Sequence, residues 1–212
     1  MKKVIIATHN KHKLIEFNHM LKPLGYEAIS LFDLNYFTEI EETGTTFEEN
    51  SYIKAQTIYN IFHMPVIADD SGLSVDALNG LPGIYSHRYS GENGDDKSNR
   101  EKLILELKKI PESHFNAKFI CAITYIDDAK TIKTLGILDG EIILEERGNS
   151  GFGYDPIFYL KDLNKTVAEL GEEKKNEISH RHIALLKLTE ELKSCNSWYF
   201  LIFMAIYHYS MN

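Results

Sequence analysis

One stretch constrains this chain more than any other: an apolar run that leads directly into two adjacent acidic residues. Val66–Ala68 predicts a short buried strand, and Asp69 and Asp70 follow where that strand is expected to end. Ligands bind at the carboxyl ends of strands in open α/β sheets. Two carboxylates there are costly to bury unless positive charge compensates them, as a divalent cation such as Mg²⁺ would. An acidic turn that caps the next element is the alternative.

Composition narrows the class of protein. Apolar residues make up 43% of the 212 residues and charged residues 25%, and no Pro-, Gly- or Ser-rich linker divides the chain, so one globular domain is expected. The net charge of −8 argues against general binding to nucleic acid or to an anionic membrane. Two cysteines without metal-type spacing and no signal-peptide pattern indicate a reducing cytoplasm.

A second polar stretch, Thr8-His9-Asn10-Lys11-His12-Lys13, lies between an expected strand, Lys3–Ala7, and an expected amphipathic helix. Free backbone N–H groups at a helix start form an anion site, and Lys13 would add a charge one turn in. The stretch lacks the glycines of a Walker A loop. An ordinary helix cap with a solvated lysine is the alternative that these residues leave open.

Further elements are expected along the chain. Thr46 and Glu49 predict a capping box for a helix from Phe47 to about Phe62. Its buried face would comprise Phe47, Ile58, Ile61 and Phe62, with Lys54 on the polar face. The other expected elements are a strand at Gly25–Leu31, a helix from Asp95 or Ser98 to Lys109, and β-rich segments at Ala117–Ile126 and Lys130–Leu144, the last bent or split near Gly136 or Gly140.

Two late segments carry unusual chemistry. Gly148–Pro156 interleaves glycines with Phe152 and Tyr154, which suits close backbone approach and ring stacking on a ligand. A glycine-rich hairpin with core aromatics is the alternative. His180 and Arg181 stand at an expected helix start, where the helix dipole disfavours cations. They indicate a nearby anionic or carbonyl-bearing group, or a salt bridge to Glu177.

Seven motifs occur in order and with compatible spacing between about residues 3 and 192: Thr8-x-Asn10-x-x-Lys13, Glu42-Thr43-Gly44, Phe47-x-Glu49-Asn50-x-x-x-Lys54-Ala55, Ala68-Asp69-Asp70-Ser71-Gly72-Leu73, Gly80-x-Pro82-Gly83, Gly151-Phe152-Gly153-Tyr154-Asp155-Pro156-x-Phe158 and Lys175-x-x-x-Ser179-His180-Arg181. Together they resemble the inosine triphosphatase family, pyrophosphatases for non-standard purine nucleoside triphosphates. The resemblance implies an α/β fold with a long mixed central β-sheet flanked by helices, two lobes around a substrate cleft, a homodimer and a Mg²⁺ requirement.

The resemblance also implies roles for individual residues. Asp70 is the expected proton acceptor and, with Glu42, a metal ligand, while Asp69 supports it as the second catalytic acid. The expected triphosphate-binding residues are Thr8, His9, Asn10, Lys11, His12, Lys13, Lys54 and Ser71. Phe152 would stack on the base, and the pocket would be completed by Gly153, Tyr154, Asp155, Lys175, His180 and Arg181.

The implied function is hydrolysis of ITP, dITP and XTP to the monophosphate and pyrophosphate, which cleanses the nucleotide pool. A catalytically idle purine nucleotide-binding sensor or scaffold is the alternative. Paired acids opposite phosphates favour the enzyme, since a binding module would not need them. The implied partners are a small nucleoside triphosphate and a second copy of the chain, without nucleic acid.

The resemblance covers residues 1–193, expected as a single two-lobed domain. Residues 194–212 have no counterpart in the family pattern and contain the uncharged apolar run Trp198–Tyr207. This run is too short for a spanning helix, which needs about 20 residues. An aggregation-prone strand, a dimer-surface contact and an extension without function are the interpretations that remain.

Overall fold

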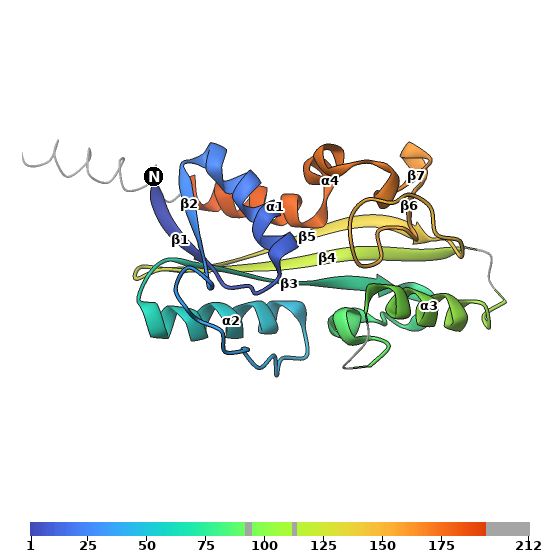
Figure 1. The fold of residues 1–212 in the computed structure, drawn as a ribbon, viewed down its shortest axis with the longest axis horizontal. Helices are drawn as coiled ribbons and strands as arrows, with labels where there is room; N and C mark the ends of the chain where they lie inside the picture. The colour runs from blue at the N-terminus through green and yellow to red at the C-terminus, as the bar shows by residue number, and fades with distance from the viewer. Residues whose placement is uncertain (92–94, 112–113, 194–212) are drawn as a thin grey trace, which may run out of the picture.

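The computed structural model describes residues 1–91, 95–111 and 114–193, so the expected tail at 194–212 lies outside the described residues. Within these residues a seven-stranded sheet has the order β2-β1-β3-β4-β5-β6-β7 (Figure 1). The strands are β1 (Lys2–Ile6), β2 (Tyr26–Ser30), β3 (Val66–Val75), β4 (Phe115–Ile126), β5 (Thr131–Ile142), β6 (Phe158–Leu160) and β7 (Lys165–Thr166).

The helices connect and cover these strands. The α-helices are α1 (Lys11–Leu21), α2 (Phe47–Phe62), α3 (Asp96–Leu107) and α4 (Glu172–Ile178), and residues 180–193 are also helical. The 3₁₀ helices are η1 (Lys22–Leu24), η2 (Asp76–Leu78), η3 (Gly83–Arg88), η4 (Lys161–Leu163) and η5 (Val167–Glu169). None of the helices in the described part of the chain combines the length and apolar character needed to span a bilayer.

The sheet is mixed. β1 pairs in parallel with β2 and β3, whereas each pair from β3 to β7 is antiparallel. Parallel neighbours need a crossover connection, which α1 supplies between β1 and β2. The predicted fold class, a long mixed sheet flanked by helices, is confirmed.

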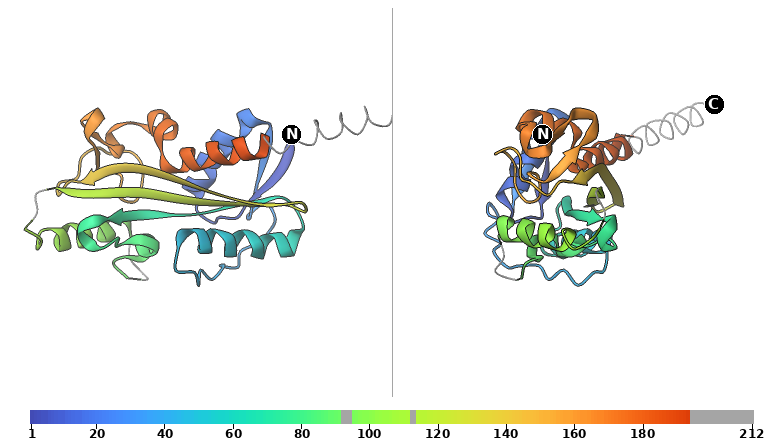
Figure 2. Two further views of the ribbon diagram at one scale, coloured as in Figure 1. Left: turned by 180° about the vertical axis from the view of Figure 1, so that it is seen from behind. Right: turned by 90° about the vertical axis from the view of Figure 1, so that its right-hand side faces the viewer.

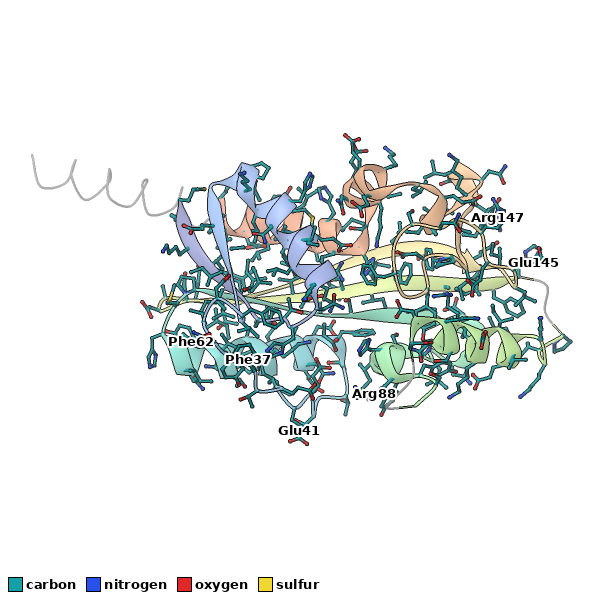
Figure 3. All side chains as sticks on the ribbon, viewed as in Figure 1. Phe37, Glu41, Phe62, Arg88, Glu145 and Arg147 are labelled. Carbon is teal, nitrogen blue, oxygen red and sulfur yellow. The ribbon has the colours of Figure 1, made fainter. Side chains whose placement is uncertain are left out.

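Helices cover both faces of the sheet. α2 and α3 lie against one face, and α1, α4 and the 180–193 helix lie against the other, as Figures 1 and 2 show. Side chains fill both layers (Figure 3). Because successive strand residues point to opposite faces, Ala68 of β3 packs with Ile58 of α2, whereas Ile67 packs with Phe17 of α1 and Leu185 of the 180–193 helix.

The expectation that the strand ends at the two acids is wrong. β3 continues to Val75, because β4 pairs with it from Val66 to Val75 without interruption. Asp69 and Asp70 therefore lie in the middle of a central strand, and the continuous ladder outweighs the low strand propensity of aspartate. As consecutive strand residues, they present their side chains to opposite faces of the sheet.

The capping residues in the sequence predicted the starts of α2 and α3 correctly. α2 has the predicted bounds, and Thr46 Oγ1 accepts a hydrogen bond from Glu49 N at 3.1 Å. The Glu49 carboxylate also accepts a hydrogen bond from Thr45 N at 2.6 Å. Asp95 caps α3 with reciprocal bonds to Ser98. Ile61, predicted to be buried, is 49% exposed.

The strand β5 passes Gly136 and Gly140 unbroken, so the expected split is not observed. Gly136 instead allows close packing of the 180–193 helix, since a Cβ atom there would lie 2.0 Å from the carbonyl oxygen of His180. The absence of a side chain thus brings the helix start, with His180 and Arg181, directly onto the sheet.

Candidate active site

The Asp69 carboxylate is buried beneath α1 and the 180–193 helix. Its Oδ2 atom lies 2.9 Å from Lys13 Nζ and 3.4 Å from Arg181 Nε, and it accepts a hydrogen bond from Ser71 Oγ at 3.1 Å. Burial raises the pKa of Asp69, but the ammonium groups of Lys13 and Lys54 outweigh it, so the pKa lies below its ordinary value. Asp69 is therefore an ionised buried carboxylate.

The Asp70 carboxylate faces α2 instead. Its Oδ2 atom accepts a hydrogen bond from Asn50 Nδ2 at 3.0 Å, and its Oδ1 atom lies 3.8 Å from Lys54 Nζ. The same Lys54 ammonium lies 2.5 Å from Glu42 Oε1, so it bridges the two acids. Lys54, expected on the polar face of its helix, points into the site with a side chain only 11% exposed.

The electrostatic environment of Asp70 differs from that of Asp69. Burial raises the pKa of Asp70, Glu42 raises it further, and the attraction of Lys54 does not fully compensate, so the net shift is upward. For Lys54, burial lowers the pKa, but Asp70, Asp69 and Glu42 together raise it above its ordinary value. A carboxylate with a raised pKa is the better proton acceptor, which distinguishes Asp70 from its neighbour.

Glu42 and Asp70 fit a divalent metal ion by their chemistry. Both carboxylates converge on one positive centre, the Lys54 ammonium, and hard oxygen ligands of this kind suit Mg²⁺. No group of three or more His, Cys, Asp or Glu side chains is arranged for a metal in the described ranges. A metal ion held here would therefore complete its coordination with water and substrate oxygens, as Mg²⁺ usually does.

The stretch between β1 and α1 forms a helix cap. Thr8 Oγ1 accepts a hydrogen bond from Asn10 N at 3.1 Å, and Asn10 Oδ1 accepts from Lys13 N at 3.2 Å. Of Thr8 and Asn10, the two candidate caps in the sequence, it is Asn10 that caps α1. Lys11 is exposed at the first turn. Lys13 is not solvated, because its ammonium pairs with Asp69. The stretch therefore caps α1 and also places a positive charge beside Asp69.

Of the two histidines in this stretch, the structure describes the side chain of His9. His9 Nε2 lies 3.0 Å from the carbonyl oxygen of Tyr36, and the His9 ring stacks on the Tyr36 ring and meets the edge of Phe32. His9 therefore anchors the stretch to the neighbouring segment. The side chain of His12 lies outside the described part of the structure.

The Gly151–Asp155 loop and α4 form a second cluster. Asp155 Oδ2 accepts hydrogen bonds from Phe152 N at 2.9 Å and from Lys175 Nζ at 2.8 Å. The Lys175 ammonium also lies 4.1 Å from the centre of the Phe152 ring. Gly151 is required here, because a Cβ atom would lie 2.1 Å from Asp155 Oδ2. Tyr154 is buried and donates its hydroxyl hydrogen to Ser86 O at 2.9 Å.

Glu16 of α1 joins the two clusters, and the sequence analysis did not single it out. It is buried, contacts Lys175 Nζ at 3.3 Å and forms an ion pair with Arg181 Nη1. Arg181 in turn pairs with Asp69 and not with Glu177, which instead pairs with Lys174. Helical spacing was the available signal, because Glu16 lies one turn beyond Lys13 and hence on the same face.

His180 is buried and lies in a ring stack with Phe119, with ring centres 5.0 Å apart. Its Nδ1 atom makes no hydrogen bond with the described residues. Burial, with a contribution from Lys175, lowers the pKa of His180 to about 3, so its ring is neutral. A small cavity of about 10 Å³, roughly the size of one water, is lined by His180, Ser179, Lys175, Asp155 and Phe119 together with neighbouring apolar groups.

The Ham1 family model matches residues 4–191 of the chain. A dITP/XTP pyrophosphatase of Bacillus subtilis strain 168 is 50% identical over 195 residues, which cover 92% of this chain and 98% of that protein. A dITP/XTP pyrophosphatase of Bacillus licheniformis is 52% identical over 190 residues, which cover 89% of this chain and 97% of that protein.

Solved structures agree with these relatives. The Ham1 protein of Staphylococcus aureus superposes with a TM-score of 0.82 at 42% identity, covering 91% of this chain and 99% of that chain. A HAM1 protein from Coxiella burnetii gives a TM-score of 0.84 at 39% identity, covering 92% of this chain and 100% of that chain. The likeness therefore extends over nearly the whole described chain.

Substitution of Glu16 tests the bridge between the clusters. Glu16→Gln keeps the side-chain size but leaves the buried Arg181 and Lys175 with less compensating charge. The free energy of unfolding should fall by about 3–5 kcal/mol, as when one partner of a buried pair is removed. Glu177→Gln removes an exposed glutamate from an ion pair and serves as the control, with no comparable loss. Equal denaturant midpoints for the two variants would contradict the bridge.

The buried neutral His180 predicts a pH dependence of stability. The pKa is about 3 in the folded chain and 6.5 ordinarily, so between about pH 6.5 and pH 3 the unfolded state binds this proton and the folded state does not. Stability should therefore be lost as pH falls from about 6.5, by at most about 1.4 kcal/mol per pH unit. His180→Gln lacks this contribution. Parallel pH profiles of denaturant unfolding for variant and wild type would refute the assignment.

Proposed function

The chain belongs to the Ham1 family, and on that premise we propose that it hydrolyses ITP, dITP and XTP to the monophosphate and pyrophosphate. Family membership confirms the resemblance to the inosine triphosphatase family that the motifs predicted. The named activity of relatives at about 50% identity supports the substrate class. The single observation that carries the reaction is the position of the Asp70 carboxylate, which lies 3.8 Å from the Lys54 ammonium that also contacts Glu42.

In the proposed reaction a water oxygen attacks the α-phosphorus of the triphosphate. The bond from the α-phosphorus to the oxygen that bridges to the β-phosphorus breaks, and pyrophosphate leaves. Asp70 accepts the proton that the water loses, a step that contributes about 10²–10⁴-fold in rate. The position of Asp70 supports this role, because it lies beside Asn50 and Lys54 on the α2 face, whereas Asp69 Oδ2 is already enclosed by Lys13 and Arg181.

Lysines on both faces of β3 are suited to bind the triphosphate of the substrate. Lys13 and Lys54 lie on opposite sides of the two acids, and both carry positive charge toward the same part of the strand. Charge that builds on the departing pyrophosphate is stabilised when such cations are already in position. Lys54 would exchange its contact with Glu42 for phosphate oxygens when substrate binds.

Ham1 family pyrophosphatases are generally metal-dependent. For this chain the metal is proposed to be Mg²⁺, held by Glu42 and Asp70. When bound, such an ion supplies charge neutralisation on phosphate oxygens and lowers the pKa of a bound water. Removal of Glu42 would then weaken metal binding without touching Asp69.

The base end of the site supports selection for a keto purine. Hypoxanthine and xanthine present a 6-keto acceptor and an N1 proton, whereas adenine presents a 6-amino donor and no N1 proton. Arg181 and Lys175 carry donors only, and a neutral His180 offers one donor and one acceptor. An unmatched polar edge in a buried pocket is strongly rejected. Phe152 would stack on the base.

The remaining parts of the proposal rest on the resemblance. We propose a homodimer that acts in the cytoplasm, with residues 1–193 as its pyrophosphatase domain. Nucleic acid is not among the proposed partners, because the net charge of −8 is unfavourable for it.

Product analysis tests the proposed function. Purified protein with Mg²⁺ should convert ITP, dITP and XTP to the monophosphate and pyrophosphate and should leave ATP almost untouched. Ion-exchange chromatography of the nucleotides, with a separate assay of pyrophosphate, measures both products. Orthophosphate with a diphosphate product would overturn attack at the α-phosphorus. Equal turnover of ATP would overturn the base assignment, and binding of ITP without turnover would identify an idle sensor.

A further inference from the structure

The residue after Phe152 is a glycine that packing does not restrain. Gly153 has φ of +60°, and a Cβ atom there would meet no described atom within 4 Å. Glycine loses the most conformational freedom on folding. The position of the ring proposed to stack on the base therefore depends on hydrogen bonds to the peptides around Gly153.

Helix α3 supplies both of those bonds. Gly153 N donates to Asp96 Oδ2 at 2.7 Å, and Gly153 O accepts from Arg100 Nη1 at 2.8 Å. The N–H belongs to the Phe152–Gly153 peptide and the carbonyl to the Gly153–Tyr154 peptide. Asp96 and Arg100 are four residues apart, so they share one face of α3. One helix face thus fixes both peptides that flank the glycine.

Arg100 is itself held in place. Its Nε atom donates to Glu146 Oε1 at 2.9 Å, and its Nη2 atom donates to Glu146 Oε2 at 3.1 Å. This two-bond fork fixes the plane of the guanidinium, whose side chain is only 12% exposed. The remaining donor, Nη1, is consequently held in position for the hydrogen bond to Gly153 O.

We propose that Asp96 and Arg100 are positioning residues for the nucleobase, and that together they form a clamp on Gly153 that sets the Phe152 ring for stacking. The inference rests on the proposed function. Asp155 of the same loop already accepts a hydrogen bond from Phe152 N at 2.9 Å and is itself paired with Lys175 of α4 at 2.8 Å. The clamp completes the restraint from the α3 side, so the two helix layers jointly define the ring position.

The clamp acts on the base and not on the reacting phosphate. Stacking contributes equally to the ground state and the transition state, so its weakening raises KM and leaves kcat unchanged. Stacking on an aromatic ring contributes about 1–3 kcal/mol per base, and partial loss corresponds to about a tenfold rise in KM. Inorganic tripolyphosphate lacks a base, so its inhibition constant should not change.

The test compares three variants with wild type in steady-state hydrolysis of ITP. Arg100→Met removes the donor to Gly153 O, and Asp96→Ala removes the acceptor for Gly153 N, so each variant removes one half of the clamp. Arg147→Met is the matched control, because Arg147 also pairs with a glutamate, Glu169, at 2.9 Å without contacting Gly153; Figure 3 labels it. We expect about a tenfold higher KM with unchanged kcat for the two clamp variants, and wild-type values for the control.

Specific results would overturn the clamp. An unchanged KM for ITP in Asp96→Ala, with an active wild type, overturns the clamp and leaves the proposed function intact. A parallel rise in the inhibition constant of tripolyphosphate overturns it as well, because the effect would then be general. If Arg100→Met does not fold, Asp96→Ala alone decides. A wild type inactive on ITP would overturn the proposed function itself.

Discussion

The ionised carboxylate of Asp69, buried in the central strand, is the interaction on which the site depends. Lys13 of α1 and Arg181 of the 180–193 helix both converge on its Oδ2 atom. A buried charge is tolerated only while its partners stay in place. One anion therefore fixes a lysine at the proposed phosphate end and an arginine at the proposed base end. Glu16 extends the same charge network to Lys175 and on to Asp155.

The alternation of a β-strand separates the two acids. Because neighbouring residues of β3 face opposite sides of the sheet, Asp69 is surrounded by cations while Asp70 is paired with Asn50 and Lys54. Adjacent carboxylates thereby acquire opposite pKa shifts, downward for Asp69 and upward for Asp70. One strand thus supplies both a fixed structural anion and a basic carboxylate, two roles that a single environment could not support.

Local patterns in the sequence predicted local structure. The bounds of α2 and the caps at Asn10, Thr46 and Asp95 follow from residues a few positions apart, which the sequence displays directly. Features that depend on distant partners were missed. The strand was expected to end at the acids because its pairing with β4 is not visible locally. Helical periodicity placed Lys54 on the polar face, because periodicity cannot show a buried acid pair, whereas the family resemblance placed it among the triphosphate-binding residues. Glu16 was overlooked because Arg181 lies 165 positions away.

We propose that Asp69 maintains the structure of the site while Asp70 accepts the proton of the attacking water. The direct measurement is unfolding free energy and ITP turnover for Asp69→Asn and Asp70→Asn side by side. Asp70→Asn should fold as stably as wild type and lose at least about 10²-fold in turnover. Asp69→Asn should lose about 3–5 kcal/mol of unfolding free energy, because Lys13 would be left without its anion and Arg181 would keep only Glu16. A fully stable Asp69→Asn, together with an Asp70→Asn that retains wild-type turnover, would contradict this division of roles.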